Sequence, residues 1–178
     1  KNAGKITGAE HGIKIKEASS SFNISNTATG IIEGKTARST DAGFTLDNDG
    51  IFNGTAGNGV KLQKAGKSKI ENNGTIQGTT NGIITTDDNR LQLINSGLIK
   101  GSESAVTFKS NQNNSLTLKK GSQLDGDVFS TNSKDNTLIL LEDGSEDSNF
   151  LGLNDGDGFA SLTMDGTDWA LTGDIDII

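Results

Sequence analysis

A Gly-x-apolar-x-Gly unit recurs along this chain of 178 residues at a nearly constant interval. Five clean copies begin at Gly4, Gly30, Gly50, Gly74 and Gly97, so successive first glycines are 26, 20, 24 and 23 residues apart. A degenerate sixth copy, from Gly121 to Gly126, follows 24 residues later. A period near 23 residues is typical of repeat proteins, in which one unit cannot bury its own apolar side chains and neighbouring units must stack.

Two further strand signals accompany each copy of this unit. The second signal, often opened by Gly, comprises residues 12–15, 43–46, 59–62, 82–84 and 105–108. The third precedes the next unit, at residues 22–24, 70, 91–93, 116–118 and 138–140. The second copy lacks a third strand of its own, which fits its 20-residue interval. Three short strands per period predict an all-β fold, a right-handed parallel β-helix with about 23 residues per coil.

Stacking of the coils at about 4.8 Å brings equivalent inward residues into columns. The first predicted column consists of Ile6, Ile32, Phe52, Ile76 and Ile99, and the second of Ile13, Phe44, Val60, Ile83 and Val106. A polar ladder is expected at one corner, where an Asn stands two residues before the repeat Gly in four coils: Asn2, Asn48, Asn72 and Asn95. Amide side chains in register can bond along such a stack. We expect the glycines to supply corner conformations with positive φ.

Other folds explain the sequence less well. No window of a dozen residues carries apolar side chains at the helical spacing i, i+3, i+4 and i+7. The Leu-x-x-Leu-x-Leu frame of a leucine-rich repeat is missing, and an antiparallel sandwich would not require a fixed period. The chain has no Cys and one His, which excludes disulfides and zinc–thiolate sites and disfavours histidine-based catalysis.

The C-terminal part differs in charge from the rest. After Lys134 there is no Lys or Arg, so residues 1–134 carry 16 − 12 = +4 and residues 135–178 carry −11. The end of a coil stack leaves core and backbone unprotected, so terminal repeats must differ from internal ones. We therefore expect two regions, β-helix coils over 1–134 and an acidic C-terminal cap over 135–178, with Trp169 closing the last coil.

The Asn-x-Gly-x-Ile-x-Gly coils and the closing Leu-x-Met-x-Gly-x-x-Trp-x-Leu-x-Gly segment resemble a bacterial autotransporter (type V secretion) passenger over essentially the whole chain. The segment from Trp169 to Gly173 resembles the autochaperone region of pertactin-like passengers, which in that family precedes an outer-membrane β-barrel translocator. The chain opens in mid-pattern at Lys1 without a signal peptide, so we expect a fragment that lacks this barrel.

The resemblance implies export through the periplasm and outer membrane, to the bacterial cell surface or the medium, with folding that starts at the C-terminus. A chain without Cys cannot be locked by disulfides before export, and a chain without Pro has no slow prolyl isomerisation. The folding cap is expected to depend on four residues: Gly166, Trp169, Leu171 and Gly173.

No catalytic, metal-binding or cofactor-binding residues are predicted. His11 lacks the Gly-Asp-Ser-Gly segment of a serine protease, so a surface or corner position is the expected one. Acid pairs such as Asp87–Asp88 are typical of turns, where Asp bonds the local backbone. The oxygen-rich loop from Asn154 to Gly158 lacks both the EF-hand spacing and the Gly-Gly-x-Gly-x-Asp repeat of calcium sites.

Basic residues of the first coils are the best candidates for binding. Stacking could merge them into a strip that attracts anionic glycans, although a charged face that only keeps the protein soluble is the alternative. The candidate strip consists of Lys14, Lys16, Lys35, Arg38, Lys61, Lys64, Lys67 and Lys69.

The expected function is therefore that of a non-catalytic adhesin or virulence factor that binds host cell surface, matrix or glycans, with possible self-association and no nucleic-acid partner. A released effector acting on a host cell-surface receptor, or a segment that serves only as stalk and secretion-folding module, remains the alternative. A polysaccharide-cleaving enzyme is disfavoured, because no aromatic platform accompanies the acid pairs.

Overall fold

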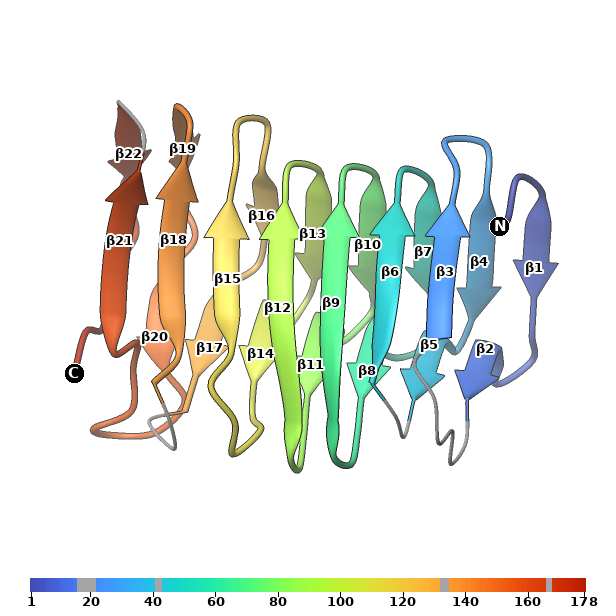
Figure 1. Cartoon of the computed structure of the whole chain (residues 1–178), viewed down its shortest axis with the longest axis horizontal. Helices are drawn as coiled ribbons and strands as arrows, with labels where there is room; N and C mark the ends of the chain where they lie inside the picture. Colours follow the sequence, from blue (N-terminus) through green and yellow to red (C-terminus); the bar gives the residue numbers. More distant parts are fainter. Residues whose placement is uncertain (16–21, 41–42, 132–134, 166–167) are drawn as a thin grey trace.

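A computed structural model describes residues 1–15, 22–40, 43–131, 135–165 and 168–178, with the side chains of 37–40 left out. All regular elements in these ranges are β-strands, and the pairings between them are parallel and join equivalent strands of successive coils. Figure 1 shows the result as a rod, in which the strands follow one another along the long axis in sequence order. The chain forms a parallel β-solenoid of about seven turns, as the repeat predicts.

Within the described ranges, three sheets form the long faces of the rod. Two of these sheets contain seven strands, and the third contains six. Sheet A consists of β3 (Phe22–Asn26), β6 (Phe44–Asn48), β9 (Gly66–Asn72), β12 (Asn89–Asn95), β15 (Ser115–Leu118), β18 (Thr137–Leu141) and β21 (Ser161–Asp165). Sheet B consists of β1 (Lys5–Thr7), β4 (Ile31–Gly34), β7 (Ile51–Gly54), β10 (Thr75–Gly78), β13 (Leu98–Gly101) and β16 (Gln123–Asp125). Sheet C consists of β2 (His11–Ile15), β5 (Thr36–Thr40), β8 (Val60–Leu62), β11 (Asn81–Thr85), β14 (Ser104–Phe108), β17 (Val128–Ser130) and β20 (Phe150–Gly152).

A separate two-stranded sheet D, made of β19 (Gly144–Glu146) and β22 (Trp169–Leu171), follows sheet B near the C-terminal end. The predicted coil length holds through the middle of the rod. Leu93 pairs with Ile70 on one side and with Leu116 on the other, each 23 residues away. Alternation of buried and exposed residues in strands such as β6 sends one set of side chains inward and the other to solvent.

The first predicted column is confirmed, and its members Ile32, Phe52, Ile76 and Ile99 are fully buried. The second column needs one correction. Phe44 belongs to β6 in sheet A, not to the column of Val60 and Ile83. Its predicted place is taken by β5, whose Thr-Ala-Arg-Ser-Thr sequence carries no run of bulky apolar residues. The prediction that the second coil lacks a strand is therefore wrong, because stacking on β2 and β8 makes a polar segment a strand.

The asparagine ladder is confirmed and is longer than the spacing predicts. Each side-chain amide donates to the next side-chain oxygen, from Asn2 to Asn26 at 2.9 Å, Asn26 to Asn48 at 2.8 Å and Asn48 to Asn72 at 2.7 Å. Asn72 then donates to Asn95 at 2.8 Å, and Asn95 donates to the Ser122 hydroxyl at 2.7 Å. The sequence analysis did not include Asn26 in the ladder, because Asn26 stands four residues before its repeat Gly and not two.

The repeat glycines are needed for close approach between coils, which corrects the prediction of positive φ. Among the described residues, only Gly121, Gly126 and Gly156 are glycines with positive φ. At Gly74 an added Cβ would lie 2.3 Å from the carbonyl oxygen of Gly50, the equivalent residue one coil earlier. A side chain there would force the A–B corners of adjacent coils apart.

The corners between the sheets differ in length. Between sheets A and B they are short and repeat closely, as at residues 49–50, 73–74 and 96–97. Between sheets C and A they range from residues 63–65 and 86–88 to the longer 109–114 and 153–160. The asparagine ladder therefore lies at the corner between sheets A and B, which varies less in length. The segments that vary most in length lie at the corner between sheets C and A.

Candidate functional site

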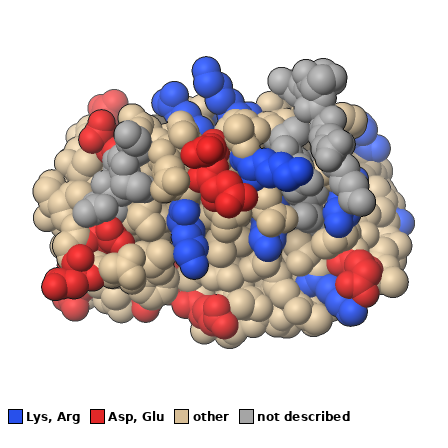
Figure 2. All heavy atoms as spheres, turned by 90° about the horizontal axis from the view of Figure 1, so that it is seen from below, with Lys and Arg blue, Asp and Glu red and all other residues tan. Residues whose placement is uncertain are grey.

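Four of the predicted basic residues lie on either side of the corner between sheets C and A. Lys61 is in β8 of sheet C, Lys64 is in the turn that follows, and Lys67 and Lys69 are in β9 of sheet A. Lys14 lies in the same row of sheet C as Lys61, with Ser39 between them. Seen from this side in Figure 2, Lys and Arg are more frequent over the N-terminal coils, with acids interspersed.

The remaining candidates of the strip lie elsewhere. Lys35 is on the corner between sheets B and C, where its Nζ lies 2.7 Å from the Glu10 carboxylate. Arg38 pairs through its backbone with Ile13 and Val60, whereas its side chain is outside the described ones. Lys16 lies outside the described residues. The structure thus brings the last four residues of the predicted strip, Lys61 to Lys69, to one corner of the rod and places Lys35 at another.

Arg90 of β12 joins this group, although the sequence prediction did not include it. It pairs directly with Lys67, one coil away. A hollow of about 270 Å³ on sheet A is lined by Lys67, Lys69 and Arg90 together with Thr45, Ser68, Gln92 and Ser115. A second hollow of about 510 Å³ at the adjoining corner shares Lys67 and Arg90 and is also lined by Ala65, Gly66, Asp88 and Gln112. The spacing of 90 − 67 = 23 residues equals the repeat period, which is the sequence signal that points to Arg90.

The electrostatics of the basic group favour an anion at its centre. Lys69 lies 3.3 Å from the Glu71 carboxylate, so its charge is partly compensated. Within the described ranges, neither Lys67 nor Arg90 has a carboxylate within ion-pair distance. A cation pair without an internal partner, placed between two hollows, can bind sulfate or carboxylate groups of an extended ligand. We call Lys61, Lys64, Lys67, Lys69 and Arg90 the basic cluster.

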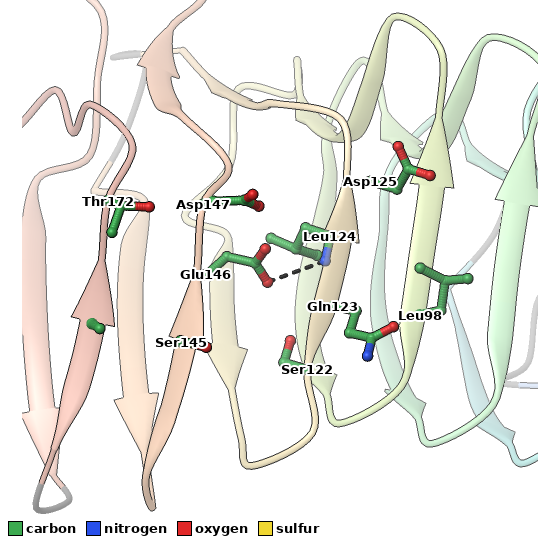
Figure 3. Close-up of a pocket in the computed structure, with 10 residues that line it drawn as sticks. Leu98, Ser122, Gln123, Leu124, Asp125, Ser145, Glu146, Asp147 and Thr172 are labelled. Atoms are coloured by element: carbon green, nitrogen blue, oxygen red, sulfur yellow. Dashed lines mark hydrogen bonds between the residues drawn. The ribbon is translucent and has the colours of Figure 1, made fainter.

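A second candidate site lies where sheet B stops. In the same two coils β15 pairs with β18 and β17 pairs with β20, whereas β16 and β19 do not pair. A pocket of about 650 Å³ opens between these two strands (Figure 3). Its lining residues are Leu98, Ser122, Gln123, Leu124, Asp125, Ser145, Glu146, Asp147, Ala170 and Thr172.

Glu146 replaces the missing backbone pairing. It follows Leu124 in the inward column of sheet B, where earlier coils have Ile, Phe or Leu, and only 6% of it is exposed. Its Oε2 accepts a hydrogen bond of 3.1 Å from the backbone N–H of Leu124, as Figure 3 shows. The hydroxyl of Ser148 donates to the Leu124 carbonyl at 3.0 Å. Two side chains thus bond the N–H and C=O groups of Leu124 on the side where the next strand of sheet B is missing.

Burial raises the pKa of Glu146 to about 7, and the negative charge of Asp147 adds to this shift. Hydrogen bonds from the backbone N–H groups of Leu124 and Asp147 and from the Ser148 hydroxyl act in the opposite direction. Near neutral pH the carboxyl group can therefore exchange a proton. The sequence analysis missed Glu146, because only the register shows that it lies in an apolar column.

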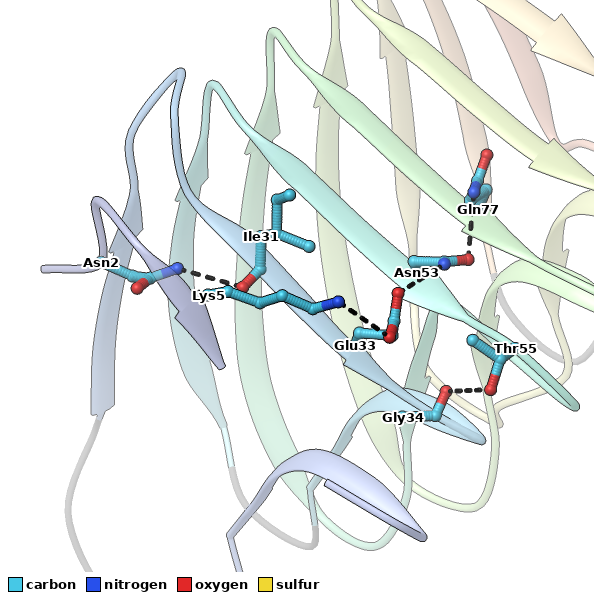
Figure 4. A network of polar contacts seen from close by, with 8 residues as sticks. All are labelled: Asn2, Lys5, Ile31, Glu33, Gly34, Asn53, Thr55 and Gln77. Carbon is cyan, nitrogen blue, oxygen red and sulfur yellow. Dashed lines mark hydrogen bonds and ion pairs between the residues drawn. The ribbon is translucent and has the colours of Figure 1, made fainter. Parts of the chain in front are cut away.

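The outer face of sheet B carries a polar network that crosses coils (Figure 4). The amide of Asn53 donates to the Glu33 carboxylate at 3.1 Å, and Gln77 donates to Asn53 at 3.0 Å. The Lys5 ammonium lies 3.4 Å from Glu33. These side chains bond mainly to one another, so this network supports stacking more than ligand binding.

The structure also places the other groups weighed in the sequence. No three His, Asp or Glu residues of the described part are placed to hold a metal ion. The loop from Asn154 to Gly158 is closed internally, because the Asp157 carboxylate accepts from the backbone and side-chain nitrogens of Asn154 at 2.9 and 2.8 Å. His11 is half-buried in β2, and burial together with the charge of Lys14 lowers its pKa.

Of the predicted folding cap, Trp169 and Leu171 lie on β22 and contact the core cluster. The indole N–H of Trp169 donates to the Leu141 carbonyl at 3.3 Å, and its ring covers Gly144, where an added Cβ would lie 2.5 Å from the ring. Gly173 packs on the Ser148 carbonyl, and Gly166 is outside the described residues. The strands of 135–178 continue sheets A and C without a break in register. The division into coils and cap stays a prediction.

Comparison with known protein families, curated proteins and solved structures finds no match for this chain. In the part that the structure describes, no helix has the length and apolar character needed to cross a membrane. The fold itself defines the class, which is a parallel β-solenoid.

Proposed function

We propose that this chain is a non-catalytic binding segment of a bacterial autotransporter passenger, displayed at the cell surface or secreted, and that it contacts anionic glycans of host cells or matrix. The observation that carries the proposal is the pair Lys67 and Arg90 between two hollows of sheet A. The solenoid fold, the absence of Cys and the resemblance of the closing segment to autotransporter passengers support the extracellular setting.

The basic cluster suits an extended ligand better than a small one. Lys67 and Arg90 are paired residues of adjacent coils, about 4.8 Å apart along the rod. Lys69 lies two residues further along the same strand, on the same face of the sheet. Cations spread over a flat surface bind several anionic groups weakly, and a polymer that contacts them together gains from multivalency. A sulfated or uronate-containing glycan has this distribution of charge.

Elution from a heparin column by a salt gradient tests the proposal. The double variant Lys67→Gln/Arg90→Gln should elute at clearly lower salt than the wild-type chain, with roughly tenfold weaker binding from the loss of two ionic contacts. The matched control is Lys100→Gln/Lys119→Gln, which removes the same charge from two cations paired with Asp125 and Glu142. Equal shifts for both variants, or none for the first, would contradict a site at the basic cluster.

A polysaccharide-cleaving activity is the weaker candidate, and one observation favours it. A carboxyl group with a pKa of about 7 can serve as general acid or base, and Glu146 lies in a pocket with Asp147 and Asp125 on its rim. Product formation from a panel of polysaccharides, lost in Glu146→Gln, would support this activity. Absence of products across the panel favours the binding protein.

A further inference from the structure

A third hollow, of about 550 Å³, lies on the outer side of sheet B in the middle of the rod. Gly54, Gly78 and Gly101 line it, and their pairing places them in one row across β7, β10 and β13. Since coils stack at about 4.8 Å, the hollow runs along the rod and presents equivalent groups at this interval. An extended ligand with a repeat of similar length can therefore contact several coils at once.

Polar side chains border this row of glycines on both sides. Gln77 and Lys100 precede their glycines on sheet B, and Thr79 and Ser102 follow them at the corner toward sheet C. Every described residue that lines the hollow is Gly or carries a polar side chain, so the hollow does not suit a lipid or an apolar peptide side chain. The strands β7, β10 and β13 each have a partner on both sides, so they offer an extended peptide no free edge.

The hydrogen-bonding groups that remain free in the hollow are mainly acceptors. The side-chain nitrogen of Gln77 donates to Asn53 at 3.0 Å (Figure 4), whereas its Oε1 accepts no hydrogen bond from the described residues. The Ser102 hydroxyl donates to the carbonyl of Thr79, and the Thr79 hydroxyl donates to the carbonyl of Gly57 at 3.5 Å. Both hydroxyl oxygens therefore keep lone pairs that can accept. A ligand that supplies several O–H donors matches this arrangement.

The charges in the hollow compensate each other. Among the described residues that line it, the charged ones are Lys100 and Asp125, which form an ion pair while their side chains stay 51% and 57% exposed. The remaining N–H groups of Lys100 can donate to a ligand, and the Asp125 carboxylate disfavours an anionic one. The hollow therefore suits a neutral ligand, in contrast to the basic cluster on sheets C and A.

We propose that this hollow binds a neutral, hydroxyl-rich polysaccharide that lies along the rod. Sugar hydroxyl groups donate to Gln77, Thr79 and Ser102 and accept from Lys100. No aromatic ring lines the hollow among the described residues, so each sugar binds weakly and the affinity depends on how many coils the polymer contacts. The site is separate from the basic cluster, and this inference does not depend on the binding of anionic glycans there.

Frontal chromatography on columns of immobilised dextran, cellulose and galactomannan tests the proposal. The wild-type chain should be retained on at least one of these columns, and the retention should persist in high salt, because a neutral polymer forms no ion pairs. The variant Gln77→Leu/Ser102→Ala removes two acceptors from the hollow with little change in volume. It should bind the same column about tenfold more weakly, through the loss of two hydrogen bonds.

The matched control is Gln63→Leu/Ser25→Ala, which removes the same groups outside the hollow and should bind as the wild-type chain does. Lys67→Gln/Arg90→Gln should also be retained unchanged on the neutral column, so the failure of one site can be told from the failure of the other. Circular dichroism should show that all variants remain folded. Absence of retention on all three columns would overturn the proposal. So would equal retention of Gln77→Leu/Ser102→Ala and the wild-type chain, or retention that disappears in high salt.

Discussion

The corner between sheets A and B and the junction between β16 and β19 both bury polar side chains, with opposite consequences for the sheet. At the corner, asparagines recur in five successive coils, and each amide from Asn2 to Asn72 donates to the next one at 2.7 to 2.9 Å. At the junction, Glu146 occurs once in a column of Ile, Phe and Leu, and the sheet opens into a pocket beside it. The first arrangement continues the stack, and the second interrupts it.

The difference shows that repetition, more than polarity, decides whether a buried polar group stabilises a solenoid. An amide carries both donors and an acceptor, so identical amides one rung apart satisfy each other. A carboxylate only accepts, and a second carboxylate above it would repel it. Glu146 therefore stands alone and takes its donor from the backbone of Leu124, which would otherwise pair with the next strand.

The largest loss of stability is expected when an asparagine in the middle of the ladder is replaced. Asn72→Ala removes the acceptor of Asn48 and the donor to Asn95, and leaves both partners buried without it. We expect the free energy of unfolding to fall by about 3 kcal/mol, since each unsatisfied buried polar group costs about 1–3 kcal/mol. Urea denaturation measures it. The neighbouring Asn73→Ala, which removes an exposed amide, is the control, and an equal loss in both variants would contradict a special role of the buried ladder.

A smaller change in stability is expected from Glu146 at the junction between β16 and β19, and this change depends on pH. The folded pKa of Glu146, about 7, is above its ordinary value of 4.5, so the folded state binds this proton more tightly than the unfolded state. The stabilisation is fully present below pH 4.5 and is lost as the pH rises through 7. We expect a loss of about 1–2 kcal/mol across this range, because water in the pocket moderates the shift.

Denaturation of the wild-type chain and of Glu146→Gln at pH 5 and pH 8 isolates this contribution. The glutamine retains the size and an acceptor for Leu124 but cannot titrate, so the difference between the two pH values should shrink in the variant. Asp155→Asn removes an exposed acid in a loop and should leave the difference unchanged. Identical pH profiles for wild type and Glu146→Gln would show that the junction does not hold a titrating carboxyl group.

The smallest effect is expected for polar contacts that repeat on the outer surface. Gln77→Ala removes the hydrogen bond to Asn53 on sheet B, where water can replace it. We expect a loss of about 0.5 kcal/mol or less in the same denaturation experiment. A loss as large as that of Asn72→Ala would mean that repetition stabilises the stack whether or not the amides are buried.

The sequence predicts those parts of the fold in which the local pattern and the stacked structure agree. The column from Ile6 to Ile99 and the asparagines before Gly50, Gly74 and Gly97 are correct because a constant period places equal residues in register. β5 is missed because its strand conformation is imposed by its neighbours, not by its own side chains.

The candidate sites were less accessible to prediction. Arg90 is a lone cation in its coil and gains significance only from its pairing with Lys67. Glu146 belongs to a Gly-Ser-Glu segment that resembles a turn, and nothing in that segment shows that it faces Leu124 across an open sheet. Both depend on which residues lie one coil apart, and this register becomes certain only when the corner lengths are known.

The unequal lengths of the corners also determine where this molecule can accept inserted residues. Segments between sheets C and A already range from residues 63–65 to 153–160 while the flanking strands keep their pairing. Extra loops grafted at this corner would emerge along a single edge of the rod, one coil apart, without disturbing the pitch. The corner between sheets A and B is more constrained, because the asparagine that ends each of β3, β6, β9 and β12 has to stay in register with the next polar side chain of the ladder. Variation between related chains should therefore accumulate along one edge, beside the basic cluster.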